Sequence, residues 1–375
     1  MTWLQEQASH RRARGLQRSL RPRQPGSRAI DVASNDYLGL STDARVIDAG
    51  IDALRTWGAG ATGSRLVSGH TALHAELESA LANLVAAERT LVFSSGYLAN
   101  LAAVTALTDE DTLLLSDAHN HASIIDACRL SRARARVYPN KDVAAVREAL
   151  QKARGRRAVV VTDAVFSVDG DMAPLADLAE LAELHGATLI VDEAHSVGVL
   201  GPSGAGACAA VGVTGDHLIR TFTLSKALGS QGGAVAAGED VIEHLVNTAR
   251  SFIFDTGLAP AAAGSALAAT GIVLSHPGLP EQALRVTSRL CEAASAAGWQ
   301  ANPHAAAVAA LPVGPADDAV RAQQVCAEAG VDIGCFRPPS VPDDVARLRM
   351  TGHANLSADD IAAVGTALRL AKEAL

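Results

Sequence analysis

Lysine is scarce in this sequence, which has only four among its 375 residues: Lys141, Lys152, Lys226 and Lys372. Lys141 lies in an Asn-Lys-Asp turn, and Lys152 and Lys372 lie near the C-terminal ends of helical patterns, where a cation is locally stabilised. Only Lys226 lies between a predicted strand and a glycine-rich loop. Chemistry that needs a lysine amine therefore has one main candidate, although a solvated loop lysine is the ordinary interpretation of Lys226 taken alone.

The sequence also lacks features that mark other classes of protein. No apolar run reaches transmembrane length, and no segment combines the charged and apolar regions of a signal peptide. The five cysteines are odd in number, scattered and without C-x-x-C spacing, so we expect free thiols in a reducing cytoplasm. A net charge of -8 argues against a nucleic-acid-binding body.

The pattern of strands and helices predicts two kinds of domain. The chain is 49% hydrophobic and is long enough to bury a large core in more than one domain. Predicted strands and helices alternate as far as about residue 238, which is typical of a parallel sheet with crossover helices. Beyond that point, helices alternate with short strands. We therefore expect an α/β fold with a mostly parallel central sheet, divided into an N-terminal arm at 1–43, a large domain at 44–258 and a smaller C-terminal α+β domain at 259–375.

Two predicted strands deliver an acid and an amine. An apolar run at 187–191 ends at Asp192, and a strand at 218–224 leads through Thr223 to Lys226. The carboxyl ends of parallel strands are where ligands bind in open α/β folds. A lysine that can form a Schiff base, with an acid available to a pyridinium nitrogen, is the minimum equipment for pyridoxal phosphate chemistry.

Two glycine-containing segments are candidate ligand loops. A strand at 90–95 is followed by a Ser-Gly turn and a helix that starts at Gly96, which suits a phosphate group at the helix N-terminus but is equally an ordinary strand-to-helix turn. Residues 58–65 match G-x-G-x-x-G, yet a predicted helix precedes them instead of a strand, so the dinucleotide interpretation fails. A loop that approaches a ligand or a second subunit stays open.

Two histidine motifs have competing interpretations. His119 and His121 form an H-x-H pair, but no third ligand follows at zinc spacing. His121, at a strand end, can instead stack on a flat cofactor ring, although a lone histidine is more often structural. Residues 192–195 spell the helicase sequence Asp-Glu-Ala-His, but the chain has no Gly-Lys pair and hence no Walker A loop, so we reject that interpretation.

The first thirty residues are basic, with seven arginines and a single acid, Glu6. An arginine-rich, acid-poor start is compatible with a mitochondrial transit peptide. It is also compatible with a basic arm that binds a phosphorylated or carboxylated partner, or with a solvated surface helix. Because the segment continues into residues 31–40 without a cleavage-like break, we favour a retained arm.

Taken together, the motifs resemble those of the α-oxoamine synthases, a family of fold-type I pyridoxal-phosphate enzymes. The resemblance spans nearly the whole chain. It rests on Asn-Asp-Tyr-Leu-Gly-Leu at 35–40, Gly-Ser-Arg-Leu-Val-Ser-Gly at 63–69, Phe-Ser-Ser-Gly-Tyr at 93–97, Val-Phe-Ser-Val-Asp-Gly-Asp at 165–171, Val-Asp-Glu-Ala-His at 191–195 and Thr-x-Ser-Lys at 223–226. Within the family, Arg-Pro-Pro-Ser-Val-Pro at 337–342 is most similar to the branch that uses L-alanine and a pimeloyl thioester in biotin synthesis. Ser340 stands where that branch commonly has threonine, which keeps the hydroxyl.

The resemblance implies pyridoxal phosphate as the cofactor, no metal, and a role for each matched residue. Catalytic roles fall on Lys226, His121, Asp192 and His195. Lys226 would carry the cofactor and move protons at the substrate α-carbon, and a buried Asp192 would keep the pyridine nitrogen protonated. Cofactor contacts fall on Gly96, Tyr97, His121, Ser167, Asp192, His195, Thr223 and Lys226. Asn35 and Arg349 would bind the amino-acid carboxylate. The acyl substrate would contact Arg18 and Ser340, with Arg21 as the alternative to Arg18.

The expected enzyme is an acyltransferase that works as a cytoplasmic homodimer with shared active sites and binds neither nucleic acid nor membrane. Its acyl donor is pimeloyl-CoA or a pimeloyl carrier protein. A sister enzyme that uses glycine or serine with another acyl thioester is the alternative. A pyridoxal-phosphate-binding regulatory domain is a non-catalytic alternative, but the arm is too short to hold a helix-turn-helix and a linker.

Overall fold

A computed structural model describes residues 2–13, 16–18, 20, 22–153, 155–341 and 343–375. The chain forms two compact units. The larger unit comprises Asn35–Ser167 and Asp171–Ala283, and the smaller unit comprises Met1–Ser34, Val168–Gly170 and Leu284–Leu375. The domain boundaries predicted at 43/44 and 258/259 stay a prediction about folding units.

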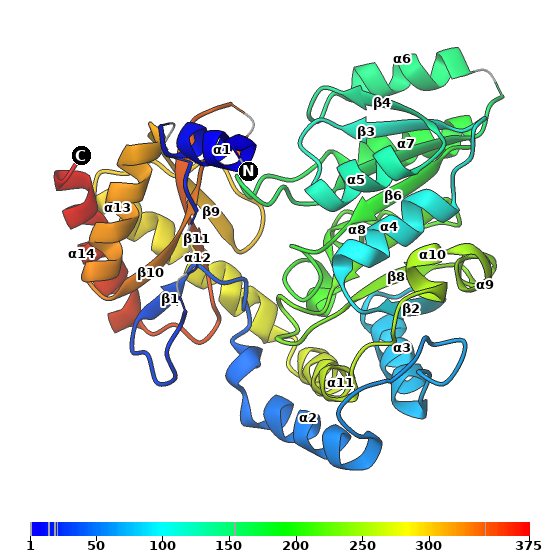
Figure 1. The fold of residues 1–375 in the computed structure, drawn as a ribbon, viewed down its shortest axis with the longest axis horizontal. Coiled ribbons are helices and arrows are strands. Elements are labelled where there is room, and N and C mark those ends of the chain that lie inside the picture. The colour runs from blue at the N-terminus through cyan, green and yellow to red at the C-terminus, as the bar shows by residue number, and fades with distance from the viewer. Residues whose placement is uncertain (1, 14–15, 19, 21, 154, 342) are drawn as a thin grey trace. The chain divides into compact units, whose positions relative to one another are not determined.

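The larger unit is built on a seven-stranded sheet in the order β2-β8-β7-β6-β5-β3-β4 (Figure 1). The strands are β2 (Arg89–Phe93), β3 (Leu113–Asp117), β4 (Arg134–Tyr138), β5 (Ala158–Asp163), β6 (Thr188–Asp192), β7 (Leu218–Thr223) and β8 (Gly233–Ala237). Five strands, from β7 to β4 in that order, are parallel, so the predicted mostly parallel sheet is confirmed. β8 is antiparallel to both of its neighbours, because the loop of 224–232 from β7 is too short for a crossover connection.

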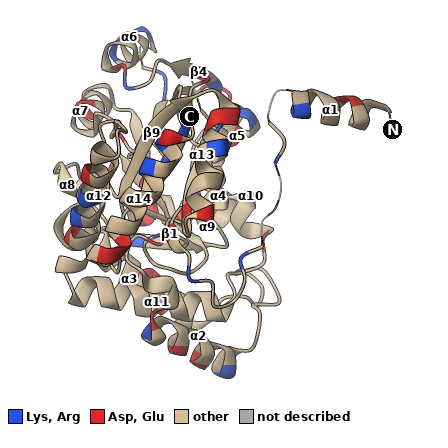
Figure 2. Ribbon diagram, turned by 90° about the vertical axis from the view of Figure 1, so that its left-hand side faces the viewer, with Lys and Arg blue, Asp and Glu red and all other residues tan. Residues whose placement is uncertain are grey.

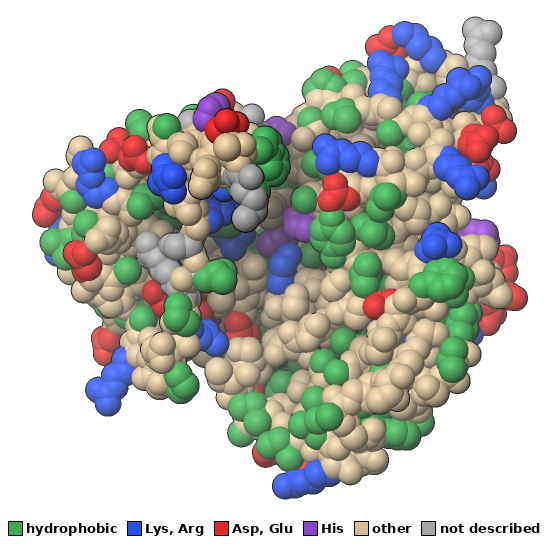
Figure 3. Space-filling view, in the orientation of Figure 1, with side chains coloured by type: hydrophobic (Ala, Val, Ile, Leu, Met, Phe, Trp, Pro, Cys, Tyr) green, Lys and Arg blue, Asp and Glu red, His purple; other side chains and the backbone are tan. Residues whose placement is uncertain are grey.

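Helices surround this sheet and bury its apolar strands. β5 is buried at every position, as expected of a strand covered on both faces. The helices are α2 (Ala44–Trp57), α3 (Ala72–Leu84), α4 (Gly96–Ala106), α5 (Ala122–Leu130), α6 (Val143–Ala153), α7 (Leu175–His185), α8 (Ala207–Ala210), α9 (Glu239–Thr248), α10 (Arg250–Ile253) and α11 (Pro260–Ser275), with short 3-10 turns η1 (Leu40–Thr42) and η2 (Pro202–Gly204). α12 (Gly278–Ala296) begins in this unit and ends in the smaller one. Hydrophobic side chains reach the surface over α2 (Figure 3).

The smaller unit is an α+β fold on a four-stranded sheet in the order β1-β10-β11-β9. Its strands are β1 (Ile30–Val32), β9 (Val308–Gly314), β10 (Val331–Phe336) and β11 (Ala346–Thr351), and its helices are α1 (Thr2–Ala13), α13 (Ala316–Glu328) and α14 (Ala358–Glu373). α14 starts at a capping box in which Ser357 and Asp360 exchange hydrogen bonds. Acidic and basic residues are interspersed along the helices (Figure 2). Among the described residues, no helix combines the length and the apolar character needed to cross a membrane.

Candidate active site

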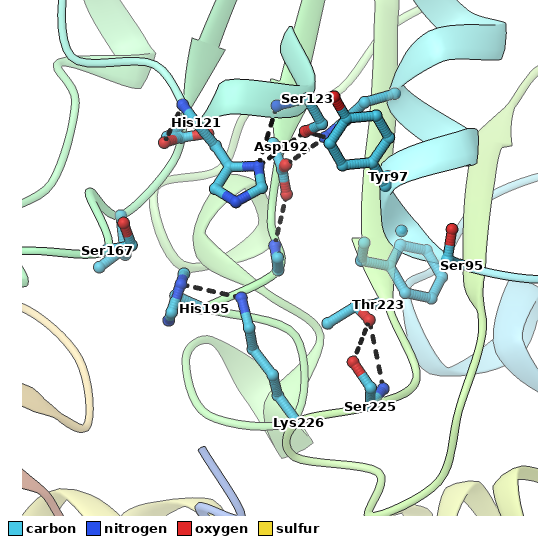
Figure 4. A pocket seen from close by; sticks show the side chains of 16 residues that line it. Ser95, Tyr97, His121, Ser123, Ser167, Asp192, His195, Thr223, Ser225 and Lys226 are labelled. Carbon is cyan, nitrogen blue, oxygen red and sulfur yellow. Dashed lines mark hydrogen bonds between the residues drawn. The ribbon is translucent and has the colours of Figure 1, made fainter. Parts of the chain in front are cut away.

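A cavity of about 230 Å³ lies in the larger unit at the carboxyl ends of β5, β6 and β7 (Figure 4). The N-termini of α4 and α5 also reach it, because both helices follow strands of the same sheet. Eight residues that the sequence assigned to the cofactor line this cavity together: Gly96, Tyr97, His121, Ser167, Asp192, His195, Thr223 and Lys226. The parallel sheet thus brings strand ends from distant parts of the chain to one edge, as its topology requires.

The lysine amine is held by a histidine. Lys226 lies in the loop after β7, and its Nζ is 2.8 Å from His195 Nε2. His195 Nδ1 is 2.6 Å from the hydroxyl of the fully buried Tyr37. The loop turns back at Gly229, where φ is +57° and a Cβ would lie 2.5 Å from the backbone nitrogen of Ser41. Only glycine fits that close approach, so the loop places the amine in one defined position.

The Asp192 carboxylate ends β6 and is 7% exposed. Its Oδ1 accepts a hydrogen bond from the backbone nitrogen of Ala194 at 2.8 Å, and its Oδ2 accepts one from Asn100 Nδ2 at 2.6 Å. Asp163 is its register partner at the end of β5. Burial, together with the charge of Asp192, holds the pKa of the Asp163 carboxyl well above its usual range. The pocket therefore has one oriented carboxylate beside a second acid that resists ionisation.

His121 forms the N-cap of α5, and Asp163 joins this segment to the end of β5. The backbone nitrogen of His121 donates to Asp163 Oδ2 at 3.0 Å, and the backbone nitrogen of Asp163 donates to Asn120 Oδ1 at 2.9 Å. Burial lowers the pKa of the His121 ring, and the charge of Lys226 adds to that effect while Asp192 opposes it. A neutral imidazole at this position suits stacking on a flat aromatic ring.

The start of α4 provides the fourth element of the site. Ser95 caps the helix by accepting a hydrogen bond from the Leu98 nitrogen at 3.2 Å. A Cβ at Gly96 would lie 3.1 Å from the Cβ of Thr223, so the helix start and the end of β7 pack closely. Helix N-termini favour phosphate groups because their N–H groups lack partners in the helix. An amine, a buried carboxylate, an imidazole face and a helix N-terminus in one cavity fit the aldehyde, nitrogen, ring and phosphate of pyridoxal phosphate.

The residues predicted to bind the acyl substrate lie in the smaller unit. Arg18 Nη2 donates to Ser340 Oγ at 3.1 Å, and both side chains line a surface cavity of about 620 Å³ with Arg337. Arg21, the alternative to Arg18, lies outside the described residues, as does Pro342 at the end of the same motif.

The residues predicted to bind the amino-acid carboxylate lie in separate units. In the smaller unit, Arg349 on β11 is 5% exposed, and its guanidinium lies 4.4 Å above the centre of the Phe336 ring. In the larger unit, Asn35 Oδ1 accepts a hydrogen bond from the Tyr37 hydroxyl at 3.2 Å. Their shared role stays a prediction.

Among the residues that sequence reasoning missed are four that hydrogen-bond to assigned residues of the pocket: Tyr37, Asn100, Ser123 and Asp163. Two of them carried a usable signal. Asp163 ends an apolar strand, as Asp192 does, and Asn100 is a polar residue in a mostly apolar helix. A buried polar side chain needs a partner, which makes such a residue worth attention. The other two became significant only through partners far away in the sequence.

Comparisons with known proteins agree with this geometry. The family model "Aminotransferase class I and II" matches residues 27–368. The chain is 53% identical to the 8-amino-7-oxononanoate synthase of Mycolicibacterium gilvum (strain PYR-GCK), over 96% of this chain and 94% of that protein. It is 52% identical to the protein of that name from Mycolicibacterium smegmatis, with the same coverage.

Solved structures show the same fold. An 8-amino-7-oxononanoate synthase from Francisella tularensis superposes with a TM-score of 0.78 at 28% identity, covering 92% of this chain and 98% of that one. A serine palmitoyltransferase from S. paucimobilis, with a bound PLP-myriocin aldimine, superposes with a TM-score of 0.89 at 29% identity, covering 93% and 89%. The predicted fold class, cofactor and α-oxoamine synthase resemblance are thereby confirmed. The chain belongs to the 8-amino-7-oxononanoate synthase family, within the pyridoxal-phosphate-dependent enzymes of aminotransferase class I and II.

Proposed function

We propose that this protein is an acyltransferase that condenses L-alanine with a pimeloyl thioester. The reaction releases carbon dioxide and the free thiol, and it forms 8-amino-7-oxononanoate for biotin synthesis. The observation that carries the proposal is the cavity in which Lys226, His195 and Asp192 meet, in a chain 53% identical to a named synthase of that product.

Different side chains of the cavity transfer protons and stabilise charge. When bound, pyridoxal phosphate accepts the electron pair that a substrate carbon releases on losing a proton or carbon dioxide. Lys226, held 2.8 Å from His195, removes and returns the proton at the alanine α-carbon. The buried Asp192 carboxylate keeps the ring nitrogen protonated, because an ion pair in a poorly solvated site favours both charged forms. His121 presents its ring face, and His195 and Ser167 contact the region of the ring hydroxyl.

Arginine side chains supply the groups that bind the carboxylates of the substrates. We assign the alanine carboxylate to Asn35 and Arg349, because a guanidinium forms two parallel hydrogen bonds to a carboxylate. We assign the acyl chain to Arg18 and Ser340, which line one cavity of the smaller unit. The pimeloyl chain has a free carboxylate at the end away from the thioester. Binding of that carboxylate requires a cation at the far end of the acyl-chain site.

We propose a homodimer with shared active sites as the working form. Four exposed apolar side chains on α2 recur at near-helical spacing: Ile47, Ile51, Leu54 and Trp57. Leu66 and Val67, next to the glycine loop at 58–65, are also exposed, Val67 to 84%. Such a patch on a water-facing surface favours burial against another protein surface. A second copy of the chain would cover it, with the glycine loop reaching the partner's site.

The assignment is tested by incubating the protein with L-alanine and pimeloyl-CoA and identifying the product by mass spectrometry. We expect 8-amino-7-oxononanoate, and a parallel reaction with a pimeloyl carrier protein compares the two acyl donors. If 8-amino-7-oxononanoate forms with neither acyl donor, the proposal is wrong. All five cysteines have free thiols, which supports the reducing cytoplasm as the place of action.

A sister activity is the second candidate, because serine palmitoyltransferase structures superpose with TM-scores up to 0.92. Competition among alanine, glycine and serine for one limiting acyl thioester separates the two. Alanine should dominate turnover if the proposed function is right, and preference for serine with a long-chain thioester would favour the sister activity.

A further inference from the structure

Asn100 occupies the centre of a buried hydrogen-bond network beneath the cavity. Its Nδ2 donates to Asp192 Oδ2 at 2.6 Å and to Ser123 Oγ at 2.8 Å, and its Oδ1 accepts from Thr221 Oγ1 at 2.5 Å. None of these four residues is more than 7% exposed. Nothing in the proposed chemistry uses Asn100, yet its amide joins the acid that faces the cofactor ring to the start of α5.

The chemistry of the partners fixes the orientation of the Asn100 amide. An ionised carboxylate can only accept hydrogen bonds, so the group that faces Asp192 must be the NH₂. A flipped amide would place its oxygen against the carboxylate and its NH₂ against Thr221 Oγ1, whose hydroxyl could still turn to accept. The charged partner therefore decides the orientation, because hydrogen bonds to ionised groups are the stronger ones.

The same network decides which nitrogen of His121 carries the proton. His121 Nδ1 lies 2.7 Å from Ser123 Oγ and 3.3 Å from the backbone nitrogen of Ser123. A backbone N–H can only donate, so this contact favours a lone pair on Nδ1, but at 3.3 Å it is the weaker of the two and does not fix the tautomer without the hydroxyl. The Ser123 oxygen already accepts from Asn100, which leaves its proton for Nδ1. The neutral ring then carries its proton on Nε2, and Figure 4 shows that nitrogen turned toward the side of the cavity where Lys226 lies.

We propose that Asn100 is a positioning residue that acts on two groups at once. It holds the Asp192 carboxylate in place, and through Ser123 it fixes His121 as the tautomer with its proton on Nε2. His121 thereby faces the cavity as a hydrogen-bond donor. The inference rests on the proposed function for its link to turnover, but the state of the His121 ring can be measured without any substrate.

Charge and burial around the ring agree with a neutral donor. His121 is exposed toward the cavity, yet partial desolvation still disfavours the charged form of its ring, and Lys226 faces it as a cation. Asp192 faces it as an anion, and Asp163 accepts from its backbone nitrogen. If Nδ1 lost its hydroxyl donor, an anion close by would favour a proton on Nδ1 or a charged ring.

The test replaces the amide with its isosteric acid in Asn100→Asp. The new acid has at most one proton, which it shares with Asp192 at this short distance, so it has none left to donate to Ser123. Its remaining lone pairs attract the Ser123 hydroxyl proton, so Ser123 Oγ becomes an acceptor for His121. We expect ¹⁵N-histidine NMR of the full-length protein to show Nε2–H in the wild type and a shift toward Nδ1–H or a charged ring in the variant. The His121→Gln variant identifies the signal. The cofactor dissociation constant should rise about 10-fold or more, because a proton shared with the new acid weakens the Asp192 charge that faces the ring nitrogen.

A second variant and a matched control keep the test decisive. Ser123→Ala removes the hydroxyl but keeps the backbone donor, so both neutral tautomers should become visible even if Asn100→Asp folds poorly. Asn302→Asp makes the same change where Asn302 donates to Asp169 Oδ1 at 2.8 Å in the smaller unit, and it should leave the His121 signals unchanged. If Ser123→Ala and Asn100→Asp both keep the wild-type Nε2–H signal, the proposal is wrong whether or not the protein makes the expected product.

Discussion

The side chain that contacts its amine distinguishes Lys226 from the other lysines. Lys141 pairs with Asp171, Lys152 pairs with Glu148, and Lys372 lies 4.6 Å from the centre of the Trp299 ring. Each of those amines sits beside an acid or an aromatic face outside the cavity. Lys226 instead lies beside an imidazole, which can accept its proton.

This arrangement predicts where the cofactor attaches. After borohydride reduction of the holoenzyme, peptide mapping should find the adduct on Lys226. The Lys226→Ala variant should lose both the adduct and turnover, because Lys226 is the only lysine among the described residues that line the cavity. Lys152→Ala is the control and should keep both. An adduct on Lys141, Lys152 or Lys372 in the wild type would contradict the assignment.

A second residue-scale prediction concerns Asp163, whose folded pKa is raised mainly by burial. A carboxyl with a raised folded pKa stabilises the fold in its protonated form. That contribution is complete below the unfolded pKa and is lost as the pH rises through the folded value. Asp163→Asn keeps an oxygen acceptor for the His121 nitrogen and cannot ionise. The free energy of unfolding of the variant should therefore exceed that of the wild type by an amount that grows as the pH rises above about 4.

Urea unfolding of the cofactor-free full-length chain across a pH series measures this difference. Asp52→Asn is the control, because Asp52 lies at the surface with 74% of its side chain exposed. Parallel pH curves for the wild type and Asp163→Asn would show that Asp163 does not resist ionisation in the folded protein.

Arg18 is the third residue whose role can be measured. It should bind the distal carboxylate of the pimeloyl chain, and loss of one hydrogen-bonded contact to a charged group costs about 1.5–3 kcal/mol. Arg18→Ala should then lower kcat/KM for the pimeloyl thioester by roughly 10- to 150-fold. The loss should shrink with an uncharged acyl thioester of equal length. Arg23→Ala, which changes an exposed arginine of the same arm, should have little effect; equal losses in both variants would argue for a general effect of arm charge.

At the scale of elements, a buried ion pair fixes the turn that follows β6. Glu193 is fully buried and pairs with Arg220 on β7, whose side chain is 7% exposed. Glu193 also accepts a hydrogen bond from the Cys208 nitrogen at 2.8 Å. Because Glu193 directly follows Asp192, this pair anchors the backbone that presents Asp192 to the cavity.

Breaking that pair should be costly. Arg220→Met leaves the Glu193 charge buried without its partner and should lower the free energy of unfolding by about 3–5 kcal/mol. Arg89→Met removes an arginine from an exposed pair with Glu239 and should cost less than about 1 kcal/mol. Denaturant unfolding of both variants makes the comparison. Similar losses in the free energy of unfolding would mean that burial does not increase the contribution of the Glu193–Arg220 pair to stability.

The elements that the sequence predicted are those with a strong local pattern. β6 and β7 coincide with the strands expected at 187–192 and 218–224, and β10 and β11 agree with the short strands expected in the smaller domain. β8 was not predicted, because Gly-Ala-Val-Ala-Ala has little preference for a strand and forms one only between β2 and β7. β1 has three residues and depends on pairing with β10, so no local signal marks it.

The same physical limit applies to the site. Lys226 and Asp192 could be predicted to lie close together because Asp192 ends one strand and Lys226 follows another, and parallel strands share an edge. Asn100 could not be given its role from local sequence, because Thr221 and Ser123, which orient it, come from β7 and α5. Sequence reasoning finds residues whose role follows from their own element, and it misses those whose role is defined by a partner on another.

At the scale of the whole molecule, the exposed apolar face of α2 sets the expected assembly. Ile51 and Leu54 lie on one side of the helix, 38% and 42% exposed, while Gly50 and Ala53 on an adjoining side pack against α11. Removing apolar surface from water contributes roughly 25 cal/mol for each Å² buried. A second copy of the chain covering this face would therefore gain stability without any change in the fold of the larger unit.

The double variant Ile51→Asp/Leu54→Asp should separate the subunits. In sedimentation equilibrium, the wild type should be a dimer and the variant a monomer, because two carboxylates on the buried face would lose their hydration. The monomer should lose turnover yet keep its circular dichroism spectrum, since both side chains are exposed in the single chain. Leu184→Asp makes the same change at an exposed leucine on α7, which is 68% exposed and outside the α2 face, and it should stay dimeric and active. A wild type that sediments as an active monomer would show that the α2 face has another occupant and that each active site is built from one chain.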